Sequence, residues 1–313
     1  MKILIADSLH ADGIAIFQKE GFALEVYKSI SPQDLAQALG GVEGLVIRSA
    51  TKVTRDLLSH ADKLKVVGRA GAGLDNVDIP ACTARSVAVM NTPGQNSNAA
   101  AELALAYIFA LSRHLCKADA SMKAGRWDKK ILQGQEVKGK TLGIVGIGNI
   151  GRILAELAGG VKMRVIGADP FLSAEQIRER GVEPAGFADI LAQADYISVH
   201  APRSKETVNL FNAETLSRMK KSAYLINCAR GGIVDEQALA EAVEKGIIAG
   251  AALDVYAEEP LSPSSPLLRL ENIACTPHLG ADTSESQVNV AAAVARQMSE
   301  FLKTGHNQFV VNL

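Results

Sequence analysis

Cysteine and net charge are both scarce in this sequence of 313 residues. The four cysteines stand at positions 82, 116, 228 and 275, and no pair has the spacing of a metal site or a redox motif. We therefore expect free thiols and a place in the reducing cytoplasm. Lysine and arginine (33) nearly balance aspartate and glutamate (34), and they form no basic stripe. This balance argues against a nucleic-acid partner and favours a small molecule.

Long apolar runs are also absent. The apolar run that begins at Met1 ends at Asp7, too early for a signal peptide. The most apolar stretch, residues 99–111, contains Glu102 and is shorter than a membrane span. We therefore expect no membrane partner. The length of the chain favours two domains, and its apolar fraction of 48% is enough for two cores.

Short β-type segments alternate with helical patterns along the whole chain, which is typical of parallel α/β sheets. The segments that we expect to be strands are Lys2–Ala6, Leu45–Arg48, Lys65–Gly68, Val87–Met90, Leu142–Val145, Arg164–Ala168, Tyr196–Val199, Tyr224–Asn227, Ala251–Val255 and Ile273–Thr276. A short helix is predicted at Pro32–Leu39, with Ser31 as its N-cap and Pro32 in its first turn.

Two long alanine-rich helices are also predicted, one over residues 98–123 and one over residues 284–303. A polar segment over residues 125–139 follows the first of them and carries the single tryptophan, Trp127. The short apolar tail Phe309–Val311 needs a surface to pack on. We therefore expect the chain to return to its first domain, which would then be discontinuous.

A glycine motif follows one of the predicted strands. Gly146-Ile147-Gly148-Asn149-Ile150-Gly151 comes directly after Leu142–Val145, and apolar residues at helical spacing follow it. In a dinucleotide site the first glycine permits a tight turn, the second lets the backbone approach a pyrophosphate, and the third lets the helix pack on the strand. The helix N-terminus then offers free N–H groups to the phosphates. We interpret Gly146, Gly148, Asn149, Ile150 and Gly151 as cofactor-binding residues.

Asp169 stands 18 residues after Gly151, at the end of the next predicted strand. A carboxylate at this place accepts hydrogen bonds from ribose hydroxyls and repels a 2′-phosphate. The next four residues, Pro170-Phe171-Leu172-Ser173, offer no arginine for such a phosphate. The sequence therefore predicts NAD rather than NADP as the cofactor.

Four further polar residues, His200, Arg230, Asp254 and His278, lie at or just beyond the ends of predicted strands. Ligands of open parallel sheets bind beyond the carboxyl ends of the strands. Oxidation or reduction at the second carbon of a hydroxy acid needs a cation for the carboxylate, a group that exchanges the hydroxyl proton, and a carboxylate that holds this group. Arg230, His278 and Glu259 suit these three roles.

Four blocks resemble the D-isomer-specific 2-hydroxyacid dehydrogenases: Asn227–Asp235, Ala252–Val255, Glu258–Pro260 and Pro277–Gly280. The resemblance covers the whole chain and implies a catalytic set of Arg230, Glu259 and His278. It also implies that Asp254 contacts the nicotinamide carboxamide. Further residues expected along the cofactor are His200, Ala201, Pro202, Cys228, Ala229, Arg230, His278, Gly280 and Ala281.

The same resemblance implies the fold and the assembly. We expect two doubly wound parallel-sheet domains, with a Rossmann NAD-binding domain (residues 98–283) inserted into a discontinuous flavodoxin-like substrate domain (residues 1–97 and 284–313). The polar segment with Trp127, which follows the alanine-rich helix, has too few apolar residues to pack alone. We therefore expect the helix and this segment to contact a second copy of the chain in a homodimer.

The first domain narrows the substrate. Ile47–Thr54 and Gly68–Asp78 resemble the branch of the family that oxidises D-3-phosphoglycerate to 3-phosphohydroxypyruvate, the first step of serine biosynthesis. The resemblance implies that the loop over residues 71–73 binds the substrate carboxylate through backbone N–H groups, with two arginines near the phosphate. The substrate-binding residues that we expect are Arg48, Arg69, Ala72, Gly73, Asn96, Arg230 and His278.

Two positions depart from that branch, namely the segment Pro93–Ser97 and Ala201. The end of the chain at Leu313 leads us to expect that the C-terminal regulatory domains of longer relatives are absent. A hydroxypyruvate or glyoxylate reductase, or a dehydrogenase for another anionic 2-hydroxy acid such as sulfolactate, remains the enzymatic alternative. Glu259 disfavours the formate dehydrogenase branch, which carries glutamine there. An NADH-sensing corepressor-like binding protein is the non-enzymatic alternative.

Overall fold

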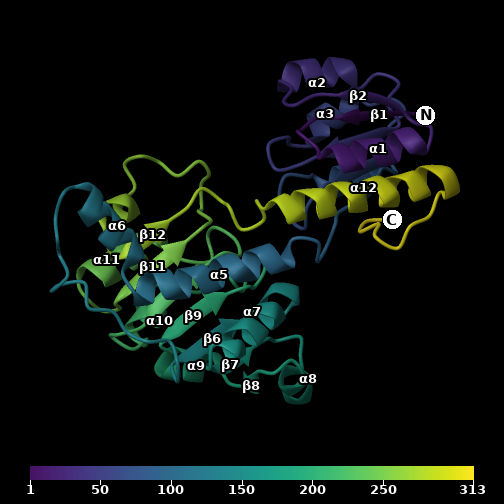
Figure 1. The fold of residues 1–313 in the computed structure, drawn as a ribbon. Coiled ribbons are helices and arrows are strands. Elements are labelled where there is room, and N and C mark those ends of the chain that lie inside the picture. Colours follow the sequence, from purple (N-terminus) through teal and green to yellow (C-terminus); the bar gives the residue numbers. More distant parts are fainter. The chain divides into compact units, whose positions relative to one another are not determined.

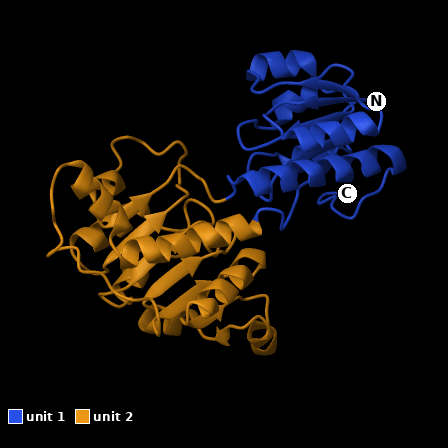
Figure 2. Cartoon of the chain, in the orientation of Figure 1, with its two compact units in different colours: residues 1–96, 281–313 blue, residues 97–280 orange.

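The computed structural model describes all 313 residues and divides them into two compact units (Figures 1 and 2). Unit 1 comprises residues 1–96 and 281–313, and unit 2 comprises residues 97–280. The boundaries expected from the sequence lie one residue later at the first crossing and three residues later at the second. The chain thus leaves unit 1, builds unit 2 and returns.

Unit 1 is built on a five-stranded sheet in the order β2-β1-β3-β4-β5, with every pair parallel. Its strands are β1 (Lys2–Ile5), β2 (Ala23–Val26), β3 (Gly44–Ile47), β4 (Val66–Arg69) and β5 (Ala88–Met90). Helices α1 (Ala11–Lys19) and α12 (Ser284–Thr304) cover one face, and α2 (Pro32–Ala38), α3 (Arg55–Ser59) and α4 (Ile79–Ala84) cover the other. This strand order is the flavodoxin-like one that the sequence predicts.

Unit 2 contains a seven-stranded parallel sheet in the order β12-β11-β10-β9-β6-β7-β8, which is the doubly wound order of a Rossmann domain. Its strands are β6 (Thr141–Val145), β7 (Arg164–Ala168), β8 (Glu183–Pro184), β9 (Tyr196–Val199), β10 (Tyr224–Asn227), β11 (Gly250–Leu253) and β12 (Ile273–Cys275). The expected fold class, two doubly wound parallel-sheet domains, is confirmed.

Helices cover both faces of the unit 2 sheet (Figure 1). The cores on one face include residues of α5 (Ser97–Ser112), α7 (Asn149–Gly160) and α8 (Ala174–Glu179). Those on the other include residues of α9 (Phe187–Gln193), α10 (Ala213–Ser217), α11 (Glu236–Glu244) and the 3₁₀ helix η1 (Pro266–Arg269). Because both faces are covered, central strands such as β6 are buried at every residue. The carboxyl edge of the sheet is where side chains can meet a ligand.

The first alanine-rich helix was expected to be continuous, and this is wrong. It ends at Ser112, and α6 (Leu115–Lys123) follows at an angle of 63°. The break lies at His114, which adopts the left-handed conformation with φ of 52°. No glycine or proline marks this position, so the pattern alone could not reveal it.

No single helix of the structure is long and apolar enough to cross a membrane, and only the bent pair α5 and α6 reaches the required length and composition together.

The C-terminal tail lies against the edge of the unit 1 sheet. Val310 forms an antiparallel bridge with Met90, and the N–H of Val311 donates to the carbonyl of Val89 at 2.9 Å. The Asn312 side chain accepts from the N–H of Val89 at 2.7 Å. The tail therefore finds the surface that its apolar residues need, and it covers the edge strand β5.

Candidate active site

The glycine loop connects β6 to α7, and its three glycines meet different constraints. Gly146 has φ of 92°, and a Cβ there would lie 2.7 Å from the backbone nitrogen of Ala201. A Cβ on Gly151 would lie 2.2 Å from the carbonyl oxygen of Gly146. A Cβ on Gly148, in contrast, would meet no atom within 4 Å. The fold itself requires the first and third glycines, whereas the second borders open space.

The open space at Gly148 lies at the N-terminus of α7. Gly148 is the N-cap of this helix and has no side chain to accept from the N–H groups of the first turn. Such N–H groups carry a partial positive charge and suit phosphate oxygens. Open room, free donors and the absence of a Cβ together fit the pyrophosphate of a dinucleotide.

Asp169 follows β7 and contacts the loop that follows the neighbouring strand β6. Its Oδ2 accepts from the N–H of Ile147 at 2.8 Å, and its Oδ1 accepts from the N–H of Phe171 at 3.0 Å. The guanidinium of Arg180 donates to the carbonyl oxygen of Ile147. Asp169 therefore shapes the glycine loop in addition to its expected role at the ribose. The sequence did not indicate that the fold would bring an arginine to this loop.

His200 follows β9, beside the glycine loop. Its Nε2 shares a hydrogen bond with the hydroxyl of Ser198 at 2.8 Å, while its Nδ1 is buried and has no hydrogen-bond partner. Burial lowers the pKa of His200 to about 4, so the imidazole is neutral at physiological pH. An orphaned polar atom beside the dinucleotide loop fits a site that is completed by a ligand.

The loop after β10 is held by its own side chains. The buried side chain of Asn227 accepts from the N–H of Ala229 and donates to the carbonyl of Arg230, both at 3.0 Å. The guanidinium of Arg230 donates to the carbonyl of Ala229 at 2.7 Å. Cys228 is buried, and burial raises the pKa of its thiol, so it is a packing residue rather than a nucleophile.

His278 and Glu259 form the pair that the sequence predicts. The Nδ1 of His278 lies 2.8 Å from Oε2 of Glu259, and the other carboxylate oxygen of Glu259 accepts from the N–H of Tyr256 at 3.0 Å. The His278 side chain is 47% exposed, so its other nitrogen can be reached by a ligand. Glu258, the neighbouring acid that could in principle replace Glu259, is exposed and makes no hydrogen bond or ion pair. A histidine oriented by a carboxylate is suited to proton transfer.

Asp254 is completely buried at the end of β11 and contacts the segment after β12. Its Oδ2 accepts from the N–H of Gly280 at 2.7 Å. Its Oδ1 accepts from the N–H of Leu279 at 2.7 Å and from the hydroxyl of Thr276. Asp254 therefore holds the backbone on one side of His278. Contact with a nicotinamide carboxamide stays a prediction.

The backbone around Arg48 in unit 1 is fixed from two sides. One oxygen of Asp7 accepts from the N–H groups of Arg48 and Thr51, at 2.5 and 3.3 Å. From the other side, the amide of Asn76 donates to the carbonyls of Arg48 and Thr51, at 2.7 and 2.6 Å. The Arg48 loop is thereby pre-organised, and sequence reasoning missed both Asp7 and Asn76.

The second arginine of unit 1, Arg69, folds over the loop that follows β4. Gly71 has φ of 150°, a conformation that favours glycine, and a Cβ there would lie 1.9 Å from Nη1 of Arg69, so a side chain would also displace the guanidinium. The amide of Asn91 donates to the carbonyl of Ala72 at 2.6 Å and ties this loop to the end of β5. Gly73 and the expected substrate residue Asn96 are partly exposed in the same unit.

The predicted residues thus fall into two sets. Unit 2 gathers the glycine motif, Asp169, the segment 200–202, the segment 228–230, Asp254, Glu259, His278 and Gly280 after its strands. Unit 1 holds Arg48, Arg69, Ala72, Gly73, Asn96 and Ala281. Two of the residues that sequence reasoning missed, Asp7 and Thr276, directly follow strands or lie one residue beyond, so the rule that found Asp169 could have found them.

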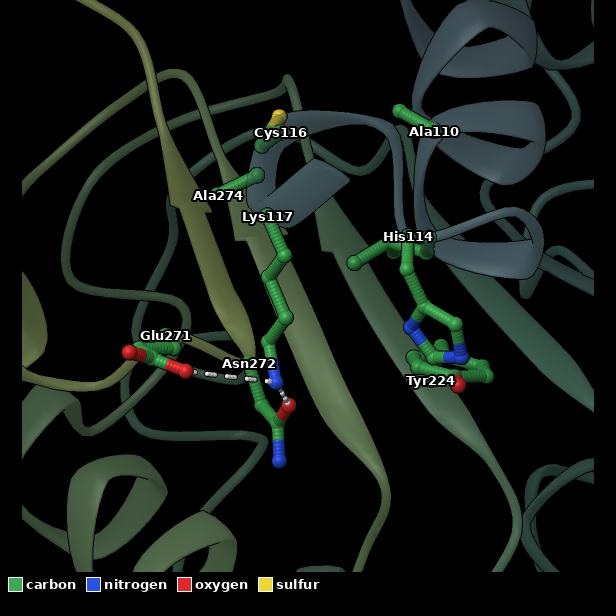
Figure 3. Close-up of a pocket in the computed structure, with 9 residues that line it drawn as sticks. Ala110, His114, Cys116, Lys117, Tyr224, Glu271, Asn272 and Ala274 are labelled. Carbon is green, nitrogen blue, oxygen red and sulfur yellow. Dashed lines mark hydrogen bonds and ion pairs between the residues drawn. The ribbon is translucent and has the colours of Figure 1, made fainter. Parts of the chain in front are cut away.

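One pocket of unit 2 lies away from these residues, at the amino ends of β10 and β12 (Figure 3). Its lining includes His114, Cys116, Lys117 and Tyr224. Lys117 there pairs with Glu271 at 3.8 Å. None of the predicted site residues lines this pocket, so it is separate from the dinucleotide loop.

Comparison with known proteins places these features. Residues 105–280 match the family described as "D-isomer specific 2-hydroxyacid dehydrogenase, NAD binding domain". D-3-phosphoglycerate dehydrogenases from Archaeoglobus fulgidus and a Synechocystis strain are 41% and 44% identical over 100% and 96% of this chain. The chain spans 59% and 54% of the length of these two relatives. A solved structure from Thermus thermophilus superposes with a TM-score of 0.90 at 31% identity, covering 99% of this chain and 100% of that one.

Proposed function

Because the chain belongs to the D-isomer-specific 2-hydroxyacid dehydrogenase family, we propose that it oxidises D-3-phosphoglycerate to 3-phosphohydroxypyruvate with NAD. The single observation that carries this proposal is the pair of His278 and Glu259, 2.8 Å apart and open to solvent, at the same sheet edge as the glycine loop. Two curated relatives of this activity support the choice of substrate.

The residues of unit 2 divide the work. The guanidinium of Arg230, on a loop fixed by Asn227, binds the substrate carboxylate. The free nitrogen of His278 accepts the proton of the C2 hydroxyl while Glu259 orients the imidazole and stabilises the imidazolium that forms. Gly148 and Asp169 would hold NAD, which would supply the acceptor for the hydride of C2, while the proton of the hydroxyl is taken up by His278.

Unit 1 is proposed to supply the selectivity for phosphate. The backbone of Arg48 is pinned by Asp7 and Asn76, so little ordering is needed when the guanidinium meets an anion. Arg69 and the loop over residues 71–73 would add charge and backbone donors for the carboxylate. Arginine suits this task because its planar fork matches phosphate oxygens.

The test is turnover with matched variants. NADH absorbance is followed with D-3-phosphoglycerate, glycerate, lactate, malate and sulfolactate. We expect D-3-phosphoglycerate to give the highest kcat/KM. His278→Ala should lose about 10²- to 10⁴-fold in kcat, the usual size of general acid–base catalysis. Glu259→Gln should also lose rate, whereas its exposed neighbour variant Glu258→Gln should behave as the wild type.

The same assay separates the alternatives. A higher kcat/KM with an unphosphorylated acid or with sulfolactate would replace the substrate but keep the enzyme class. NADH binding without turnover of any acid would favour an NADH-sensing protein instead.

We also propose that the chain forms a homodimer through the region around α6. Four large apolar side chains between residues 115 and 131 are more than half exposed: Leu115 (53%), Met122 (54%), Trp127 (78%) and Ile131 (79%). Such a group typically marks an interface. Light scattering at micromolar concentration should give twice the chain mass. Trp127→Ser combined with Ile131→Ser should give monomers, whereas Leu268→Ser, which changes an exposed side chain elsewhere, should not.

The cysteines bear on the compartment that we propose, the cytoplasm. All four are free, and Cys82 and Cys228 are buried. Burial raises the pKa of the Cys82 thiol to about 11, which keeps it protonated and unreactive. Free thiols fit a reducing compartment. Fractionation of the native host with an antibody against the chain would test this placement.

A further inference from the structure

The segment that carries His278 is held by a network of buried side chains outside the proposed catalytic set. The phenol oxygen of Tyr256 lies 3.0 and 2.9 Å from the carbonyl oxygens of Leu253 and Thr276, which share its single proton. The N–H of Thr276 donates to the carbonyl of Leu253 at 3.0 Å. These bonds fix the chain two residues before His278 to the end of β11.

On the other side of His278, the carboxylate of Asp254 accepts from the N–H groups of Leu279 and Gly280, both at 2.7 Å. His278 itself has φ of 58°, a conformation that non-glycine residues rarely adopt and that the surrounding contacts must maintain. Its backbone is therefore held on both sides, and its ring is oriented by Glu259.

The protons in this network can be assigned by counting donors. Asp254 as a carboxylate only accepts, so the single hydroxyl proton of Thr276 must point to Oδ1 of Asp254. The contact between Tyr107 and Thr276 must then have the phenol as its donor. The chain runs from the Tyr107 phenol to the Thr276 hydroxyl and on to the Asp254 carboxylate. Each hydroxyl strengthens the next bond, and no cation pairs with this completely buried carboxylate.

Tyr107 belongs to α5, which packs on one face of the unit 2 sheet. Its side chain is only 5% exposed, and burial raises the pKa of the phenol, so it stays protonated and able to donate. No role in packing requires the hydroxyl, because phenylalanine would fill the same space. The hydroxyl is present where it meets Thr276 and, at 3.5 Å, the carbonyl of Leu253.

We propose that Tyr107 and Thr276 are positioning residues, which act through Asp254 to hold His278 in its catalytic geometry. This inference rests on the proposed function, because it assumes that His278 exchanges the proton. Neither side chain needs to touch the substrate. They stabilise the carboxylate of Asp254, which accepts from the N–H groups of Leu279 and Gly280, the two residues after His278.

The experiment compares Tyr107→Phe with Tyr196→Phe in the NADH absorbance assay. Tyr196 is a matched control, because its buried phenol also has hydroxyl and amide partners, Ser112 at 2.8 Å and Gln135 at 3.0 Å, at the amino end of the same sheet. Both changes should lower the melting temperature. Only Tyr107→Phe should lower kcat, by roughly fivefold for one neutral hydrogen bond, while the dissociation constant of NADH stays within about twofold.

Thr276 gives a second test with its own rescue. Thr276→Val removes the hydroxyl donor to a buried charge and should lower kcat by roughly 10- to 100-fold. Thr276→Ser keeps the hydroxyl and should retain most of the activity.

A double-mutant comparison decides whether the effect passes through His278. In the His278→Ala background, adding Tyr107→Phe should leave the residual rate unchanged. Equal losses of kcat in Tyr107→Phe and Tyr196→Phe, or a persistent effect of Tyr107→Phe without His278, would overturn the inference while leaving the proposed function intact. A wild-type chain without turnover would overturn the proposed function, and this inference with it.

Discussion

The same substitution, glycine to alanine, should separate binding from folding at two positions of one loop. A Cβ on Gly148 would meet no atom within 4 Å, and the backbone there is extended, with φ of −74° and ψ of −153°. A Cβ on Gly151 would lie 2.2 Å from the carbonyl oxygen of Gly146. The folded chain therefore tolerates a methyl group at the first position and not at the second.

The magnitudes follow from these contacts. In Gly148→Ala, the gain from a less flexible unfolded chain, about 0.4–1 kcal/mol, offsets the poorer N-cap, so the free energy of unfolding should change by less than about 1 kcal/mol. In Gly151→Ala, an overlap with a backbone oxygen forces β6 and α7 apart, and overpacking of this kind costs about 1–3 kcal/mol. For the affinity for NAD the order of the two variants reverses, so Gly148→Ala has the larger loss. A methyl group at Gly148 blocks the close approach of the pyrophosphate, which loses one or two charge-assisted bonds of about 1.5–3 kcal/mol each.

The assay measures unfolding and binding on the same samples. Urea unfolding gives the free energy of each variant, and titration calorimetry with NADH gives its dissociation constant. Gly148→Ala should keep its stability and bind NADH at least about tenfold more weakly. Gly151→Ala should lose stability. Wild-type affinity for NADH in a fully folded Gly148→Ala variant would refute the placement of the pyrophosphate at this loop.

Asp169, Arg48 and His200 can each be tested with a single substitution. Asp169→Ser should lower the preference for NAD over NADP at least about tenfold in kcat/KM, because the charge that repels the 2′-phosphate is gone and Arg180 already reaches the loop. An unchanged preference would mean that the carboxylate only shapes the loop. Arg48→Ala should raise KM for D-3-phosphoglycerate by roughly 10- to 100-fold and KM for glycerate much less, whereas Arg55→Ala on α3 should change neither; equal increases would exclude a contact with the phosphate. The pKa of His200 in the folded chain is lowered to about 4. As the pH falls below about 6.5, this histidine binds a proton in the unfolded chain but not in the folded chain. The stability that is present at higher pH is therefore lost towards pH 4. Urea unfolding without cofactor should show a loss of about 2 kcal/mol between pH 7 and pH 5 in the wild type that His200→Asn lacks.

The strands whose bounds could be predicted most closely are central strands that are buried on both faces of the sheet. Arg164–Ala168, Tyr196–Val199 and Tyr224–Asn227 have the bounds that the sequence indicates. The strands that it missed are β2 and β8, which lie at the edges of their sheets. β2 has no buried residue and β8 has two residues, so neither leaves an apolar run to detect.

The residues of the candidate site that directly follow strands could be predicted from the sequence. That rule found Asp169, Arg230, Asp254 and His278, and the chemistry of the reaction together with the family resemblance indicated Glu259 as the partner of His278. The supporting side chains that lie on helices, such as Tyr107, were out of reach. Tyr107 is 169 positions away from Thr276, and nothing in an alanine-rich helix says which partner a tyrosine will meet. Such supports depend on how a helix lies across the sheet, which no local pattern encodes.

The position of a residue after a strand does not reveal what that residue does. In the structure, three aspartates at strand ends make the same kind of contact with a neighbouring loop. Asp7 after β1, Asp169 after β7 and Asp254 after β11 each accept backbone N–H groups from the loop that follows the adjacent strand, β3, β6 or β12 respectively. Loops at this edge must leave backbone donors near a ligand, and donors without partners cost stability. A carboxylate from the neighbouring strand satisfies some of them and leaves the others pointing outward. An acid at a strand end therefore shapes the ligand loop beside it, so a substitution that tests its contact with the ligand also tests the loop.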